Sequence, residues 1–189
     1  MRIKIASVGE LVLRGEARPL TPDEIRSQRI RDLIEHMREM LSDAPGSEPL
    51  QLAIIEDKAE YHANLAAADL AERERSPVPF HVLINPQIHL MSPPEITFYE
   101  GYLSFPGFTP LVPRARQVLV ETLDHLGEPV RIEAAGWYAR ILQHKIDHLR
   151  GTLYIDRMWS RSFSSLDNLQ PGLEIQNHGR AQADFQDKP

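Results

Sequence analysis

The segment GWYARILQHKIDHLRG, from Gly136 to Gly151, constrains the fold more than any other part of this 189-residue chain. Its apolar residues recur at the spacing of one helical face, and the closing glycine suits the left-handed conformation that ends many helices. We therefore expect a helix over residues 136–150. His144 and His148 lie four residues apart in it, so both imidazoles project from the same face.

Two histidines at this spacing are well placed to bind a divalent metal ion. In the zinc hydrolases that use it, a glutamate follows the first histidine and takes the proton from metal-bound water. Here the following residue is Lys145, a cation. An ammonium about 5 Å from a divalent ion would be repelled by roughly 7 kcal/mol at an effective dielectric constant of about 20. The segment keeps two metal-binding side chains but lacks the carboxylate base.

The composition excludes several classes of function. Apolar residues make up 42% of the chain and charged residues 25%, and the net charge of −6 is spread along the sequence. That charge gives no basic surface for nucleic acid or an anionic membrane. The N-terminus does not have the pattern of a secretory signal, and no apolar run approaches the length of about 20 residues that a membrane span needs. We expect a cytoplasmic protein with no nucleic-acid or membrane partner.

The chain contains no cysteine. Disulfides, thiolate nucleophiles and thiolate metal ligands are thereby excluded. This matters because a catalytic zinc or iron site requires three protein ligands and one open position. His144 and His148 supply two, so a third ligand would have to be another kind of side chain.

A second helix is expected near the N-terminus. Thr21 occupies the N-cap position, with Pro22 at the first helical position and Glu24 three residues after the cap. Apolar residues then follow roughly one face of the segment. The sequence therefore predicts one long helix over residues 21–46.

Strand-like segments make up much of the remainder. The expected strands and turns are residues 49–57, residues 80–90 closed by Asn85-Pro86, a β-hairpin of residues 117–124 and 130–134, and a short strand or turn at residues 152–158. Residues 60–76 fit either a short helix or an irregular insertion. The pattern predicts an α+β domain over residues 1–159, with strands packed around the central helix that carries His144 and His148.

The C-terminal part of the sequence, residues 160–189, is polar and has no regular periodicity. We expect a tail there that is either mobile or packed against a partner chain. An oligomer could form through this tail, and a structural or regulatory role for the protein would then depend on it.

Four segments resemble the peptide deformylase family, and the resemblance runs from about residue 8 to residue 158. EGYLSFPGFTPLVPR, residues 100–114, resembles the EGCLS segment of that family and the stretch behind it, and residues 136–158 resemble its HEIDH helix and the following turn. INP at residues 84–86 and VLRGEARPL at residues 12–20 fit as well. The resemblance implies the fold of the family and its activity, the removal of the N-formyl group from nascent peptides with bound iron or zinc.

By this resemblance, the positions that carry the chemistry have changed. Tyr102 stands where the family has the cysteine that is its third metal ligand, and Lys145 stands where it has the glutamate base. The family also has a Gly-rich segment that ends in an oxyanion-binding glutamine. Residues 44–53 are its candidate remnant, with Gln51 as a counterpart two residues out of register.

Other positions of the family pattern are retained. His144 and His148 would be the metal ligands, and the backbone N–H of Leu103 would be an oxyanion donor. Glu100 would pair with Arg114 and brace the loop, which is a structural role.

Two main interpretations stay open. In the first, the protein has lost metal-dependent deformylation, holds no cofactor and retains a pocket for a small molecule or a peptide N-terminus, or for a metal-free reaction with Tyr102 and Lys145 as acid and base. In the second, it is an active deformylase in which the Tyr102 phenolate joins His144 and His148 around iron or zinc. A phenol with an ordinary pKa near 10 must lose its proton to do so.

Overall fold

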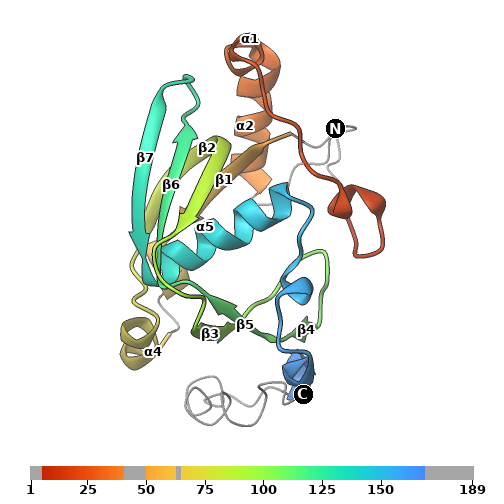
Figure 1. Ribbon diagram of the computed structural model, residues 1–189, viewed down its shortest axis with the longest axis vertical. Helices are drawn as coiled ribbons and strands as arrows, with labels where there is room; N and C mark the ends of the chain where they lie inside the picture. The colour runs from red at the N-terminus through yellow and green to blue at the C-terminus, as the bar shows by residue number, and fades with distance from the viewer. Residues whose placement is uncertain (1–5, 41–49, 63–64, 169–189) are drawn as a thin grey trace.

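The histidine helix α5, Gly136–Leu149, is the central element of the computed structural model, which describes residues 6–40, 50–62 and 65–168. It lies between a four-stranded antiparallel sheet and a smaller two-stranded sheet (Figure 1). The larger sheet has the order β1-β2-β6-β7, formed by Leu52–Asp57, Val78–Leu90, Gln117–Leu123 and Pro129–Ala135. The smaller sheet pairs β3, Ile96–Tyr99, with β5, Leu111–Arg114. The predicted α+β fold, with strands packed around a central helix, is confirmed.

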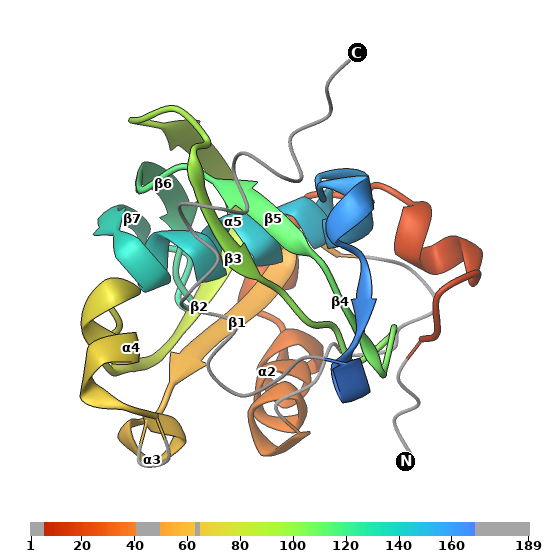
Figure 2. The same ribbon diagram turned by 90° about the horizontal axis from the view of Figure 1, so that it is seen from below.

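The larger sheet separates two hydrophobic cores, because successive side chains of a strand point to opposite faces. Ala53 and Ile55 of β1 belong to the core that contains Leu142 and Ile146 of α5. Leu52 and Ile54, which alternate with them on the strand, face the other way and join a core with the helix α2, Gln28–Met40. Figure 2 shows α2 and α5 on opposite sides of β1.

The single helix predicted over residues 21–46 is two helices in the structure. The predicted cap at Thr21 forms a capping box with Glu24 and starts α1, Pro22–Ile25. The Ser27 side chain then accepts a hydrogen bond from the backbone N–H of Ile30, at 3.3 Å, at the start of α2. A short polar side chain that bonds nearby backbone competes with a continuous helix, and this explains the break. The predicted end at residue 46 lies outside the described residues.

The strand β2 runs through Asn85-Pro86, where the sequence predicted its end. Asn85 has a φ of 52°, and the pairing of β2 with β6 shifts in register after Ile84, which defines a β-bulge. The Asn85 side chain holds the bulge in place by accepting from the Leu20 N–H at 2.8 Å and donating to the Leu20 carbonyl at 2.9 Å. A proline is tolerated in a strand at such a bulge.

The remaining segments follow the sequence pattern in part. The β-hairpin is confirmed as β6 and β7, which pair from Gln117 with Ala135 to Leu123 with Pro129. Residues 60–76 contain helical segments, α3 over Ala59–His62 and α4 over Ala67–Glu72. The segment at 152–158 forms a 3-10 turn, Tyr154–Asp156, and a similar turn at Leu11–Arg14 precedes α1.

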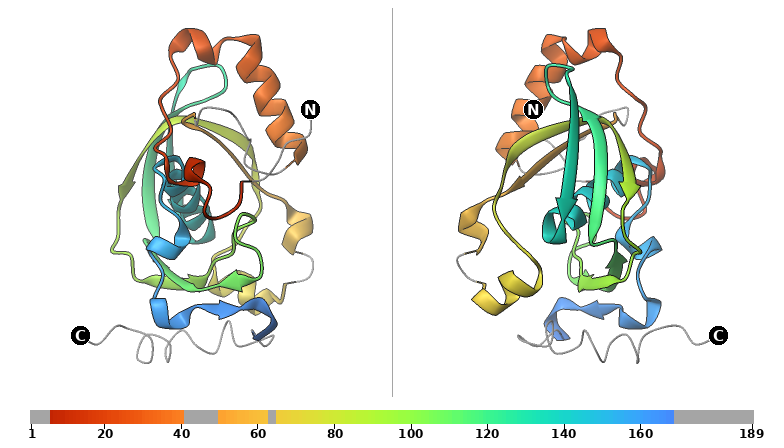
Figure 3. Two further views of the ribbon diagram at one scale, coloured as in Figure 1. Left: turned by 90° about the vertical axis from the view of Figure 1, so that its right-hand side faces the viewer. Right: turned by 60° about the vertical axis from the view of Figure 1, so that its left-hand side comes forward.

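Beyond residue 159 the chain stays against the domain as far as the structure describes it. β8, Ser164–Ser165, pairs antiparallel with β4, Phe108–Thr109 (Figure 3). The rings of Phe108 and Phe163 stack with centroids 5.1 Å apart and an interplanar angle of 5°. Residues 169–189 lie outside the described residues. The domain boundary at residue 159 and a role of the tail in an oligomer stay predictions.

Candidate functional site

A buried carboxylate, Glu100, is the centre of the site. It follows β3 directly and is 6% exposed. Arg114 at the end of β5 donates to both of its oxygens, from Nε at 3.0 Å and from Nη2 at 2.9 Å. The resemblance implied this pair, and the structure brings the two side chains together.

A second guanidinium, that of Arg140 in α5, also donates to Glu100, from Nη1 at 2.6 Å. Arg140 further donates to the carbonyl oxygens of Val112 at 3.0 Å and Ile96 at 2.6 Å, so it ties α5 to both strands of the small sheet. The sequence reasoning missed this residue. Its position four residues before His144 on the same helix was the signal that could have identified it.

Glu100 also holds one of the predicted metal ligands. Its Oε2 lies 3.0 Å from His144 Nδ1. Burial alone would raise the pKa of the Glu100 carboxyl, but hydrogen bonds with His144 and Arg114 lower this pKa well below its ordinary value. Glu100 is therefore an anion that accepts a hydrogen bond from His144 Nδ1–H, so Nε2 is the ring nitrogen of His144 that is left for a metal ion. A carboxylate behind an imidazole in this way orients histidines that bind metals.

A second buried carboxylate, Asp147, extends the network. Arg114 Nη1 forms an ion pair with it, and Arg157 donates to both of its oxygens, at 2.6 and 2.7 Å. Asp147 is 6% exposed and lies on α5 between the two histidines. The network therefore fixes α5 against β5 and against the turn that follows the helix.

Tyr102 lies directly against the two predicted metal ligands. Its ring centroid is 4.3 Å from that of His148, at an interplanar angle of 41°, and 6.0 Å from that of His144. The two imidazole centroids are 4.3 Å apart, and both ring nitrogens of His148 are buried. Three side chains from two distant segments thus meet at one place, with the phenol ring in contact with an imidazole.

The segment that carries Tyr102 is a tight turn. The Phe105 N–H donates to the Tyr102 carbonyl at 3.0 Å, and the Val8 N–H donates to the Ser104 carbonyl at 2.9 Å. Leu103, the predicted oxyanion donor, lies in this turn with 63% of its surface exposed. Its backbone is therefore next to the Tyr102–histidine cluster, as the resemblance implied.

The last two predicted site residues are placed differently. Lys145 is half-buried on α5, and its side chain leaves the helix about 100° from that of His144. Gln51 precedes β1, where its backbone N–H donates to the Arg18 carbonyl at 2.8 Å and its carbonyl accepts from the Asn85 N–H at 2.9 Å. These described contacts do not join Gln51 to the Tyr102–histidine cluster. Most of the Gly-rich remnant before Gln51 lies outside the described residues.

The donor set fits a divalent metal in its chemistry. Two imidazoles suit zinc and iron, and a deprotonated phenol is a known iron ligand. No group of three histidine, aspartate or glutamate side chains suited to a metal occurs within the described ranges. Tyr102 is therefore the side chain that would complete a site with His144 and His148.

Comparison with known proteins identifies the family. Residues 3–163 match the family of polypeptide deformylases. The chain belongs to that family. Peptide deformylase 1A of Arabidopsis thaliana, named chloroplastic/mitochondrial, is 37% identical over 174 residues, which cover 88% of this chain and 65% of the relative. The mitochondrial peptide deformylase of Homo sapiens is 33% identical over 170 residues, which cover 86% and 70%.

Solved structures of deformylases share the fold. The class I type b enzyme of Acinetobacter baumannii, solved with bound Met-Ala-Ser, aligns with a TM-score of 0.68 at 26% identity, covering 84% of this chain and 99% of that one. Arabidopsis peptide deformylase 1B, in complex with an inhibitor, gives 0.68 at 25% identity and covers 99% and 97%. The chain spans 65% and 62% of the lengths of two plant deformylases that it matches, those of Arabidopsis thaliana and Solanum lycopersicum.

The comparisons favour one of the two interpretations of the deformylase site over the other. The relatives are named for the deformylase activity, which favours the interpretation as a metal-dependent enzyme. From Tyr102 and Lys145 we expected a loss of activity and the absence of a cofactor. The comparisons with known proteins do not support either expectation. In the described part of the chain, no helix has the length and apolar character to cross a bilayer. Some relatives are organellar by name, so the cytoplasmic location stays a prediction.

Proposed function

We propose that this protein is a divergent peptide deformylase that hydrolyses the N-formyl amide of peptides with a bound iron or zinc ion. One observation carries the proposal: Tyr102, His144 and His148 meet at one place, and the buried Glu100 orients His144 from behind. An orienting carboxylate of this kind serves a metal ligand. The names of relatives that are 33–37% identical over most of this chain support the same activity.

Each side chain has a role in this proposal. His144 through Nε2, His148 and the oxygen of Tyr102 would hold the ion, and Tyr102 must lose its proton to do so. When bound, the ion would polarise the formyl carbonyl and lower the pKa of its water. The Leu103 backbone N–H would donate to the oxygen of that carbonyl as negative charge develops on it.

Lys145, in place of the family's glutamate, is expected to lower the rate of hydrolysis. As an ammonium it cannot accept a proton from water, as the glutamate of the family does. It can donate a proton to the nitrogen of the leaving amine. Proton transfer by a positioned side chain contributes about 10²–10⁴-fold to a rate. We therefore expect hydrolysis that is slower than in relatives with the glutamate by a factor of about this size.

A second candidate function is binding of a peptide N-terminus without hydrolysis. The contact between the rings of Tyr102 and His148, with centroids 4.3 Å apart, favours it. A phenol ring packed on an imidazole fills space beside the histidines, where the family has the smaller cysteine. In that case the protein would bind the peptide N-terminus at this site without hydrolysing it.

Metal content and formate release together separate the two candidates. Purified protein loaded with iron, zinc or nickel is expected to hold about one ion per chain and to release formate from formyl-Met-Ala-Ser. Tyr102→Phe keeps the ring and removes the oxygen, so it should lose the ion and the activity together. Tyr138→Phe is the matched control, because its hydroxyl lies 2.9 Å from His81 Nε2, away from the site.

Two results would contradict the proposed deformylase activity with Tyr102 as a metal ligand. Unchanged metal occupancy in Tyr102→Phe would show that Tyr102 is not a ligand. Wild-type protein that holds no ion and releases no formate, yet binds the formylated peptide saturably, would support the second candidate.

A further inference from the structure

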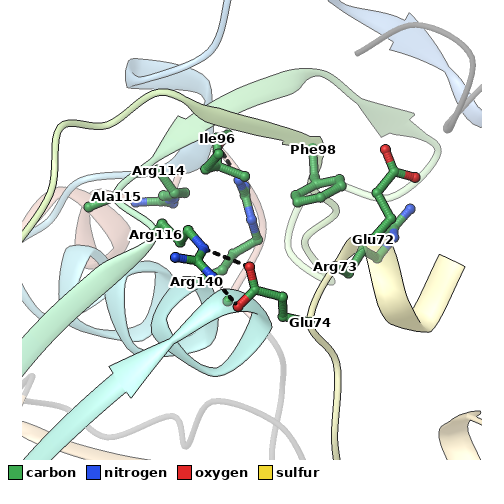
Figure 4. A pocket seen from close by; sticks show the side chains of 10 residues that line it. Glu72, Arg73, Glu74, Ile96, Phe98, Arg114, Ala115, Arg116 and Arg140 are labelled. Carbon is green, nitrogen blue, oxygen red and sulfur yellow. Dashed lines mark hydrogen bonds and ion pairs between the residues drawn. The ribbon is translucent and has the colours of Figure 1, made fainter. Parts of the chain in front are cut away.

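A cavity of about 80 Å³ lies between α4, the small sheet and the first turn of α5 (Figure 4). A water needs only about 10–15 Å³ of such volume, so the cavity has room for several waters or one small organic ion. Among the described residues that line it, neither Tyr102 nor a histidine occurs. This cavity is therefore separate from the deformylase site, although both adjoin the Glu100 network.

The wall of the cavity combines apolar and cationic groups. Ile96 and Phe98 of β3 form an apolar side (Figure 4). The guanidinium groups of Arg114 and Arg140 lie deep in it, since these residues are 3% and 4% exposed. Arg116 lies at the mouth with 51% of its side chain exposed. The lining also includes Arg73 and the carboxylates of Glu72 and Glu74, so four guanidinium groups and two carboxylates lie beside the apolar surface, with positive charge in excess.

In the network beside the cavity, each buried carboxylate is shared between two guanidinium groups. In the described residues, Glu100 pairs with Arg114 and Arg140, and Asp147 pairs with Arg114 and with Arg157, whose side chain is 47% exposed. Burial lowers the pKa of Arg140 to about 10, Glu100 opposes this shift, and Arg114 adds to it. Arg140 remains charged at neutral pH. Because Arg140 shares the single negative charge of Glu100 with Arg114, an anion beside Arg140 would add a favourable charge interaction to the folded protein.

Arg140 has hydrogen-bond donors that its described contacts do not use. A guanidinium has five N–H donors. Arg140 uses both N–H groups of Nη1, for Glu100 and Val112, and one of Nη2, for Ile96. The N–H of Nε and the second N–H of Nη2 remain. Arg116 likewise bonds Glu74 through Nε and Nη2, at 2.6 and 3.0 Å, and keeps Nη1.

The mouth of the cavity is held in an unusual backbone conformation. Glu74, the partner of Arg116, is a non-glycine residue with a φ of 49°. It packs so closely on Gly136, whose φ is 60°, that a Cβ added to Gly136 would lie 2.4 Å from that of Glu74. Left-handed non-glycine residues cluster at functional sites, where the surrounding structure has to hold them. The loop after α4 is therefore fixed against the start of α5.

We propose that this cavity binds a small monocarboxylate of the size of formate or acetate. Its two oxygens would accept from the remaining N–H groups of Arg140 and Arg116, since the planar fork of a guanidinium matches a carboxylate. Its carbon end would contact Phe98 and Ile96. The inference does not rest on deformylation, because Tyr102, His144 and His148 are not among the residues that line this cavity.

The binding can be measured directly by titrating the protein with sodium acetate or formate in a calorimeter or by NMR, at constant ionic strength in chloride. We expect saturable binding of one carboxylate, with a dissociation constant of about 1–10 mM, because so small a ligand makes few contacts. Arg116→Gln should weaken it at least tenfold. Ile96→Trp, which fills the mouth without changing charge, should abolish it.

The matched control is Arg131→Gln. Arg131 is an exposed arginine paired with Glu133 at 3.1 Å on β7, and its replacement should leave binding unchanged. Absence of saturable carboxylate binding to the wild-type protein would overturn the proposal. So would binding of equal strength in wild type, Arg116→Gln and Ile96→Trp.

Discussion

Two parts of the deformylase site follow the family pattern to different extents. The lower layer is the network of buried ion pairs around Glu100, and the upper layer consists of Tyr102 and Lys145. Glu100, Arg114 and His144 match the positions of that pattern, and the structure joins them by hydrogen bonds of 2.9–3.0 Å. Tyr102 and Lys145, which would face the chemistry, do not match it. Breaking a buried pair leaves an uncompensated charge at a cost of about 3–5 kcal/mol. Substitution of Tyr102 or Lys145 breaks none of these buried pairs, so the upper layer can change while the fold persists.

The strongest test of this comparison restores the upper layer alone. The double variant Tyr102→Cys with Lys145→Glu should raise formate release from formyl-Met-Ala-Ser by about 10²–10⁴-fold, because it returns both a thiolate ligand and a base. Metal content should be measured in the same samples. A double variant that gains neither metal nor activity would show that the lower layer, or the segment before Gln51, has changed as well.

The lower layer should be sensitive to a single substitution. Glu100→Gln keeps the shape of the side chain but leaves Arg114 and Arg140 without their shared anion, and we expect it to lower the free energy of unfolding by about 3–5 kcal/mol. Urea denaturation measures this loss. Glu133→Gln, in an exposed pair with Arg131, is the control and should stay within about 0.5 kcal/mol of wild type. Equal effects of the two variants would contradict the comparison.

The stability of the lower layer should also depend on pH. The pKa of the Glu100 carboxyl is held well below its ordinary value of 4.5 by His144 and Arg114, against the effect of burial. A folded-state pKa below the unfolded one gives stability that is complete above the unfolded pKa and is lost as the pH falls below it. The free energy of unfolding should therefore fall as the pH is lowered from about 5. Glu100→Gln should have a flatter profile, and parallel profiles would count against this role of Glu100.

The smallest effect is expected in the upper layer of the metal-free protein. Tyr102→Phe should change the free energy of unfolding by about 1 kcal/mol or less, since the ring contacts with both histidines remain. Thermal denaturation in the presence of a chelator measures it. A loss as large as that of Glu100→Gln would place Tyr102 in the structural layer instead.

The sequence predicted those parts of the fold that depend on local pattern. The helix over α5, the hairpin and the capping box at Thr21 each follow from spacing within a short segment. The break at Ser27 and the continuation of β2 through Asn85 were missed. They depend on side-chain hydrogen bonds to backbone, and the partner of Asn85, Leu20, is 65 residues away.

The candidate site was predictable to a similar degree. The resemblance placed Tyr102 beside the two histidines, and the structure brings them into contact. Arg140 and Asp147 were missed because each acts through partners in distant segments: Glu100 after β3, Arg114 on β5, or the turn after α5. The structure gives no described contact of Gln51 with the cluster. Its candidate role rested on an alignment that was out of register.

The bulge in β2 divides the backbone pairing of the larger sheet into two parts. Ile84 pairs with both neighbouring strands, but β2 pairs with β1 on the residues before it and with β6 on the residues after it. The backbone pairs of β2 with β1 and those with β6 thus meet only at Ile84, while side chains of β1 pack in both cores, Ile54 with α2 and Ala53 and Ile55 with α5. Local opening can break one set of these backbone pairs without the other, so hydrogen exchange of the β2 amides should proceed at different rates on either side of Asn85.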